Sequence, residues 1–146
     1  MTRILRFAAV AVVSLVAVGC GGSDHDSHGS TAAASRTIDV TMKEFAYEPS
    51  SVSVKSGETV KFVFHNEGQI LHDAFLGDEA AQTEHEAAMK PGGDKMDDHD
   101  ASAIKVIPGK TGEITHTFDK AGEALIIGCH ETGHYTAGMK MTVTVS

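Results

Sequence analysis

The sequence predicts an all-β sandwich with Greek-key connections, built from about seven short strands. Three observations favour this fold. Apolar and polar residues alternate with a period of two in one segment after another, as in strands with one buried face. Clusters of Gly, Pro, Asn and Ser separate these segments. The strand-rich part, residues 37–146, is long enough to bury one core without disulfides.

The first strand is expected at residues 37–43, where Ile38, Val40 and Met42 alternate with polar residues. Glu48-Pro49-Ser50 interrupts this pattern. Further strands are predicted at 52–54, 60–65, 104–107, 114–118, 123–128 and 139–145, and residues 69–77 are a short, mostly apolar segment. His116 shares the apolar face of its strand, and we interpret it as structural or as exposed at the rim.

Residues 78–103 differ from the rest of the chain and are expected to form an acidic insertion. Good helix formers predict a short helix at 80–89. Eight acidic residues and two lysines give the insertion a net charge of −6. Its soft side chains suggest a weak secondary metal site at His85, Met89, Met96 and His99. A solvated insertion without a metal is the interpretation that we favour, because nothing in the sequence fixes the geometry of these groups.

The N-terminus has the features of a signal peptide, predicted at residues 1–19. Two arginines precede an apolar run that is too short to span a membrane. Gly19-Cys20 resembles a bacterial lipoprotein lipobox, with Ala17 where Leu is usual, so lipidation of Cys20 is expected. Residues 20–36 are small and polar, and they predict a flexible linker. Its His25 and His28 could bind a metal weakly, but a solvated linker is the interpretation that we favour.

The charge of the chain restricts its partners. The 146 residues carry a net charge of −8, and removal of residues 1–19 with their two arginines leaves −10. This acidity argues against nucleic acid as a partner and against electrostatic docking on anionic lipid. The lipid anchor would instead hold the protein at the membrane.

The loop between the last two predicted strands carries the strongest chemical signal. Cys129, His134 and Met139 follow one another at even spacing, and they offer a thiol, an imidazole and a thioether. These soft and borderline ligands suit copper, and a copper site of this kind needs a second nitrogen. His72 is the best candidate, because it follows an apolar strand and a turn. His130 is a poorer one, because neighbours in an extended chain point in opposite directions.

The loop resembles that of the cupredoxin family of blue-copper proteins, especially bacterial plastocyanin/azurin-like proteins with the pattern Gly-Cys-His-x-Pro-Gly-His-Tyr-x-Ala-Gly-Met. The matching residues are Gly128, Cys129, His130, Gly133, His134, Tyr135, Ala137, Gly138 and Met139. Thr132 stands where the family usually has Pro. The resemblance covers residues 37–146 and implies a Greek-key cupredoxin sandwich. It also implies one mononuclear copper site at His72, Cys129, His134 and Met139, with Asp73 tying the ligand segments together by hydrogen bonds.

Other metal chemistries fit the sequence less well. Zinc would leave Met139 idle, because a thioether is a poor zinc ligand. A binuclear copper centre would need a second cysteine in the loop. Copper enzymes need further histidine clusters, which the sequence lacks, so we expect a protein without catalytic activity.

Two functions follow from the resemblance. The first is a one-electron carrier in which His134 reaches the surface and small neighbours form an apolar patch for a redox partner. The alternative is copper tolerance, buffering or delivery, with a copper-handling partner. In either case we expect a monomer, anchored by lipid on the outer face of the cytoplasmic membrane or lying in the periplasm.

Overall fold

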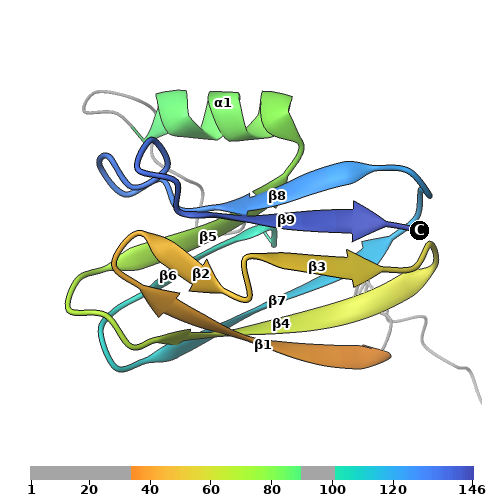
Figure 1. Ribbon diagram of the computed structural model, residues 1–146, viewed down its shortest axis with the longest axis horizontal. Coiled ribbons are helices and arrows are strands. Elements are labelled where there is room, and N and C mark those ends of the chain that lie inside the picture. The colour runs from red at the N-terminus through yellow and green to blue at the C-terminus, as the bar shows by residue number, and fades with distance from the viewer. Residues whose placement is uncertain (1–33, 90–100) are drawn as a thin grey trace, which may run out of the picture. The chain divides into compact units, whose positions relative to one another are not determined.

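Nine strands and one helix make up the part of the chain that the computed structural model describes, residues 34–89 and 101–146 (Figure 1). The elements are β1 (Arg36–Lys43), β2 (Ala46–Glu48), β3 (Ser51–Val54), β4 (Glu58–Asn66), β5 (His72–Gly77), α1 (Glu79–Ala88), β6 (Ala103–Val106), β7 (Thr111–Phe118), β8 (Ala124–Gly128) and β9 (Lys140–Val145). The predicted signal peptide, Cys20, most of the linker, Met96 and His99 lie outside the described residues.

The strands form two sheets that pack face to face, which confirms the predicted sandwich. One sheet has the order β2-β1-β4-β7 and the other β3-β9-β8-β5-β6. The chain changes sheets at residues 49–50, because β2 pairs with β1 while β3 pairs in parallel with β9. The predicted interruption at Glu48-Pro49-Ser50 is therefore the point where the chain crosses from one sheet to the other.

The strand count exceeds the expected seven, because β2 and β5 were not predicted as strands. β2 has only three residues, too few for a period of two to be recognised in the sequence. β5 (His72–Gly77) lies within the apolar segment 69–77, which lacks the alternation of a half-buried strand, and residues 69–71 belong to the preceding loop. The other predicted strands agree with the structure to within two residues at each end, except β7, which begins three residues before its prediction.

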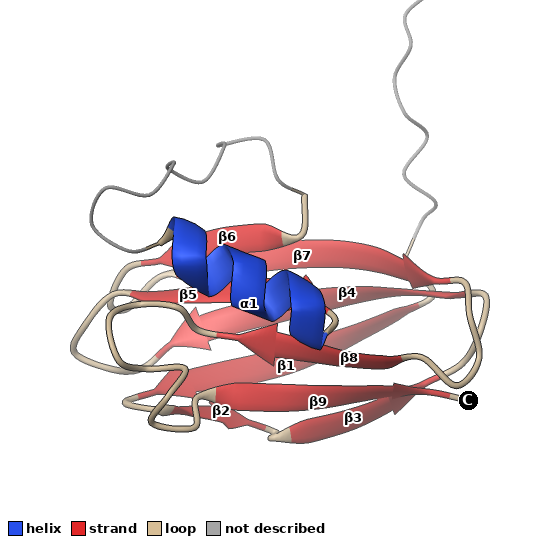
Figure 2. Ribbon diagram, turned by 90° about the horizontal axis from the view of Figure 1, so that it is seen from above, coloured by secondary structure: helices blue, strands red, loops and turns tan. Residues whose placement is uncertain are grey.

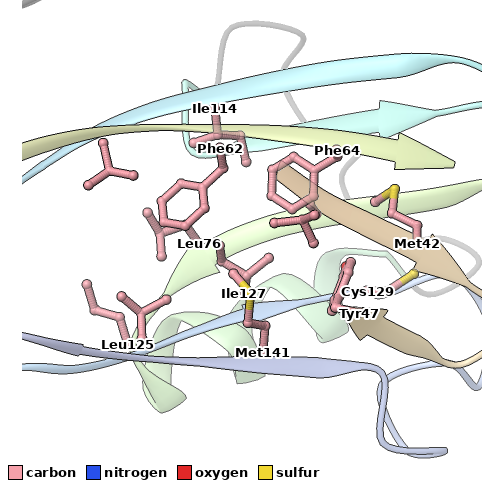
Figure 3. Packing of buried hydrophobic residues seen from close by; sticks show 14 of the residues in the cluster. Met42, Tyr47, Phe62, Phe64, Leu76, Ile114, Leu125, Ile127, Cys129 and Met141 are labelled. Carbon is pink, nitrogen blue, oxygen red and sulfur yellow. The ribbon is translucent and has the colours of Figure 1, made fainter. Parts of the chain in front are cut away.

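The core lies between the sheets and consists of the alternating apolar residues (Figure 3). Phe62 and Phe64 of β4 are fully buried, and they face Ile127 of β8 and Met141 of β9. Cys129 and Tyr47 lie close together at one end of this core. The candidate ligand Cys129 thus lies among apolar side chains in the metal-free protein.

Helix α1 lies over the outer face of β5 and β8 (Figure 2). Asp78 caps its first turn by accepting a hydrogen bond from the Ala81 amide at 2.8 Å. The helix buries two polar side chains, Gln82 and His85, against the sheet. The prediction of a helix is confirmed, and the remaining residues of α1 are exposed or half-buried.

Four loops meet at the end of the sandwich that carries Cys129. They are the β1–β2 turn, the β4–β5 loop, the β6–β7 turn and the β8–β9 loop, at the left of Figure 1. Asn66 fixes the β4–β5 loop by donating from its side chain to the carbonyls of Ile70 and Val106 at 2.8 and 2.7 Å. This loop delivers His72 to the start of β5.

A buried tyrosine connects the two sheets next to His72. The Tyr47 hydroxyl donates to the Asp73 carbonyl at 2.6 Å. Burial raises the pKa of Tyr47 well above its usual value, so the phenol keeps its proton and remains a donor. This contact fixes the backbone beside the ligand candidate His72.

We expect Tyr47→Phe to lower the free energy of unfolding of the metal-free protein by about 1 kcal/mol, because a buried hydrogen bond is lost. Urea denaturation measures this change. Lys43→Ala is the matched control, since it removes only the exposed Lys43–Glu48 ion pair of the same hairpin and should cost less than about 0.5 kcal/mol. Equal effects of the two substitutions would contradict this role of Tyr47.

Candidate metal centre

Three candidate ligands from two distant segments of the chain converge at the loop-rich end of the sandwich. His72, Cys129 and His134 are all buried, and their ligand atoms lie within 4.8 Å of one another. The Cys129 Sγ atom is 3.3 Å from His134 Nδ1 and 3.8 Å from His72 Nδ1. The two Nδ1 atoms are 3.3 Å apart. Both imidazoles therefore turn the same ring nitrogen toward the thiol.

Backbone hydrogen bonds close the β8–β9 loop on itself. The Cys129 amide donates to the Met139 carbonyl at 3.1 Å, and the Met139 amide donates to the His134 carbonyl at 3.0 Å. Gly133 and Gly138 have φ angles of 85° and 100°, which other residues rarely adopt. These hydrogen bonds hold the fully buried Met139 beside Cys129 and His134. The loop bends at the two glycines, although Thr132 stands where the family usually has proline.

Asp73 joins the loop to β5. Its Oδ1 atom accepts a hydrogen bond from the His130 amide at 2.6 Å. Asp73 follows His72 directly, and His130 follows Cys129, so one hydrogen bond links the neighbours of two ligand candidates. Burial raises the pKa of the Asp73 carboxyl, and the His130 amide opposes this effect.

The side chain of His130 points away from the three converging atoms, as the extended geometry at Cys129 predicts. Its ring nitrogens contact Glu86 Oε2 at 2.6 Å and Gln82 Oε1 at 2.7 Å, both on helix α1. The ring of Tyr135 stacks on it with centroids 4.4 Å apart. His130 is therefore occupied elsewhere and does not join the metal site.

His134 is more buried than the resemblance implies. Only 5% of it is exposed, although the family resemblance places the corresponding residue at the surface. The ring of Phe45 lies edge-on against it, with centroids 5.0 Å apart. Phe45 is itself 49% exposed and has a φ angle of 66°, which is unusual for a residue other than glycine. Phe45 thus stands between His134 and solvent.

Burial also sets the protonation of the candidate ligands in the metal-free protein. It raises the pKa of the Cys129 thiol well above its ordinary value, and the nearby Asp73 carboxyl adds to this shift. Burial lowers the pKa of His72, and His134 lowers it further. Near neutral pH the site therefore holds a protonated thiol and a neutral His72 imidazole.

The spacing of these atoms fits a bound metal ion. An ion about 2.0–2.3 Å from each of three ligands in a plane separates them by about 3.5–3.8 Å. The observed separations of 3.3 and 3.8 Å lie close to this range. Two imidazole nitrogens, one thiolate and a weak thioether form the donor set of a blue-copper site. His72, Cys129, His134 and Met139 together could therefore hold one copper ion.

The predicted secondary site is only partly within the described residues. His85 is buried, and its ring stacks on Phe75 with centroids 4.0 Å apart. Met89 is half-buried at the end of α1. Met96 and His99 fall outside the described residues, so the four are not seen together.

Three residues near the site were not predicted from the sequence as members of it. No sequence pattern places Phe45 at the site, because its unusual backbone angle depends on the β1–β2 turn. Gln82 and Glu86 lie one turn apart on α1, and this spacing places two polar side chains on one helix face. The sequence does not show that this face is the buried one.

The chain resembles known copper proteins along most of its length. The model of a family described as copper binding proteins, plastocyanin/azurin family, matches residues 34–146. A protein of Pseudomonas aeruginosa named copper-resistant cuproprotein CopI is 37% identical over 78% of each chain. A protein of Rubrivivax gelatinosus with the same name is 35% identical over 98% of each chain.

Solved structures show the same architecture. Auracyanin from Roseiflexus castenholzii superposes with a TM-score of 0.61 at 30% identity, over 77% of this chain and 98% of its own. An azurin from Methylomonas superposes with a TM-score of 0.61 at 19% identity, over 77% of this chain and 99% of its own, which supports the fold alone.

Metal uptake should depend on pH, because the Cys129 thiol must lose its proton to bind a metal. His72 is already neutral and releases none near neutral pH. We expect the affinity for Cu(I) to rise about tenfold for each pH unit between about pH 7 and 8. Competition titrations against a chelator of known affinity measure this slope. A flat profile would show that the thiol is already ionised.

Loss of the Phe45 ring should open the site to solvent. For Phe45→Ala we expect a bound copper ion to pass to an external chelator about tenfold faster, because the shield over His134 is gone. Stopped-flow absorption measures the transfer rate. Ile107→Ala is the control, since Ile107 is another exposed apolar residue, 56% exposed, whose side chain has no aromatic ring to cover His134. A similar acceleration in both variants would contradict the shielding role.

Proposed function

Because the chain belongs to the plastocyanin/azurin family of copper-binding proteins, we propose that it holds one copper ion at His72, Cys129, His134 and Met139 and serves in copper tolerance. One observation carries the proposal: three buried ligand atoms from two distant segments lie within 4.8 Å of one another. The relatives named copper-resistant cuproproteins support the assignment to tolerance.

Each part of the chain contributes a separate property to copper binding. Cys129 and Met139 supply sulfur, which favours copper over harder cations. Asp73 fixes the spacing between the β5 segment and the loop. Phe45 and the surrounding core keep water from the ligands. Bound copper would supply a centre that exchanges one electron, and the rigid ligands would limit rearrangement on its reduction.

Electron transfer is the second candidate function, and a surface feature favours it. The large exposed apolar residues of the described chain are Phe45, Ile70 and Ile107. All three lie in loops at the ligand end of the sandwich (Figure 1). Such a patch suits brief docking of a redox protein. The small residues Gly133, Ala137 and Gly138 of the β8–β9 loop, which were expected to form an apolar patch, are also exposed.

The proposed location is outside the cytoplasmic membrane, because residues 1–19 have the features of a signal peptide and Cys20 stands where a lipoprotein would carry its lipid. Within residues 34–89 and 101–146, no helix has the length and apolar character needed to cross a membrane. A monomer without catalytic activity, with a copper-handling or redox protein as partner, completes the proposal.

Addition of Cu(II) to the purified protein tests the site. We expect one equivalent to bind and to give an intense blue absorption from the thiolate–copper bond. Cys129→Ser should abolish this colour, and Cys20→Ser should leave it unchanged. A colourless protein that retains zinc would refute the proposal.

Growth in copper separates the two functions. We expect deletion of the gene to lower the copper concentration at which growth stops, and the wild-type gene to restore tolerance. The Cys129→Ser gene should fail to do so. Normal growth of the deletion strain in copper, together with rapid electron exchange by the purified protein, would favour the electron carrier.

A further inference from the structure

Helix α1 buries polar rather than apolar side chains against the sheet, which is unusual for a helix that covers a core. Gln82 is completely buried. Its amide nitrogen donates to the carbonyls of Ile126 at 2.7 Å and Phe75 at 3.1 Å, on β8 and β5. These contacts fix the orientation of the amide, so the Gln82 oxygen faces the loop that carries Cys129.

The Gln82 oxygen and the Glu86 carboxylate hold the two nitrogens of one imidazole, that of His130. The two helix residues are one turn apart and therefore project from the same face. Tyr135 stacks on the ring at an interplanar angle of 19°. The His130 side chain, none of which is exposed, is held at both nitrogens and on one face.

The sequence before Cys129 is adapted to this arrangement. A methyl group at Gly128 would lie 2.5 Å from Gln82 Oε1 and 2.6 Å from Tyr135 Cε2. Real side-chain carbons do not approach other atoms so closely, so any larger residue would displace Gln82 or Tyr135. Glycine at this position permits the contact between helix and loop.

We propose that Gln82 and Glu86 are positioning residues of the metal centre, which act through His130 to fix the Cys129 thiol. Adjacent side chains of an extended chain point in opposite directions, so a backbone rotation that displaced the His130 ring would also move the Cys129 side chain. The Asp73 carboxylate holds the peptide between them from the β5 side. Helix α1 and β5 thereby restrain the same peptide from two directions.

The positioning role of Gln82 and Glu86 rests on the proposed function, in which Cys129 binds copper. Groups that orient metal ligands typically change metal affinity by about 10–100-fold when they are removed. A helix of the acidic insertion would thus do more than cover the sheet. It would determine how firmly the thiol is placed for the metal.

The first test uses no copper and therefore does not depend on metal binding. In full-length, metal-free protein with Cys20→Ser, Cys129 is the remaining thiol. We expect a disulfide reagent to modify it about tenfold faster in Gln82→Leu and Glu86→Ala, because the loop opens more readily. Glu86→Gln, which keeps an acceptor oxygen, should restore a rate near that of the parent. Glu84→Ala, on the exposed face of α1, should leave the rate unchanged.

The second readout is the copper-loaded protein. We expect the Glu86→Ala variant to shift the energy of the thiolate–copper absorption and to bind copper about tenfold more weakly. Unchanged thiol rates in Gln82→Leu and Glu86→Ala, with only a lower melting temperature, would overturn the proposal. If Gln82→Leu does not fold, Glu86→Ala decides, because the Glu86 side chain is 31% exposed and its truncation opens no core cavity. Failure to bind copper in the parent protein would refute the proposed function but not the thiol result.

Discussion

The hydrogen bond from the His130 amide to the Asp73 carboxylate connects two segments that are 57 positions apart in the chain. Each partner is the direct neighbour of a ligand candidate, so the bond sets the separation between His72 and Cys129. Tyr47 fixes the Asp73 backbone from the other sheet. The metal centre therefore depends on a contact that exists only when β5 and the β8–β9 loop are both in place.

The site combines apolar burial with a thiol, that of Cys129, which must lose its proton to bind a metal. Burial keeps the Cys129 thiol protonated and His72 neutral in the metal-free protein. The two imidazoles already face the thiol in the metal-free protein. Folding, and not metal binding, therefore supplies the free energy that brings the ligands together. Such a preformed site restrains the geometry of bound copper and limits its rearrangement on a change of oxidation state.

Local patterns were sufficient to predict much of this molecule. Alternating residues such as Val60, Phe62 and Phe64 identified the main strands, because a buried strand face leaves a period of two in the sequence. The ligand loop was recognisable because its three candidates lie within eleven residues. His72 was identified by its apolar setting. The three-residue strand β2, the burial of His134 beneath Phe45 and the contact of Gln82 with His130 depend on tertiary packing, which leaves no local pattern.

X-ray absorption at the copper edge of the loaded protein shows directly whether the fold presents two imidazoles and one thiolate to a single ion. We expect two nitrogen ligands from His72 and His134 and one short bond to the sulfur of Cys129. Cys129→Ser should remove the short sulfur contribution and keep the nitrogen ligands. A copper environment of oxygen and nitrogen alone in the unsubstituted protein would contradict ligation by Cys129.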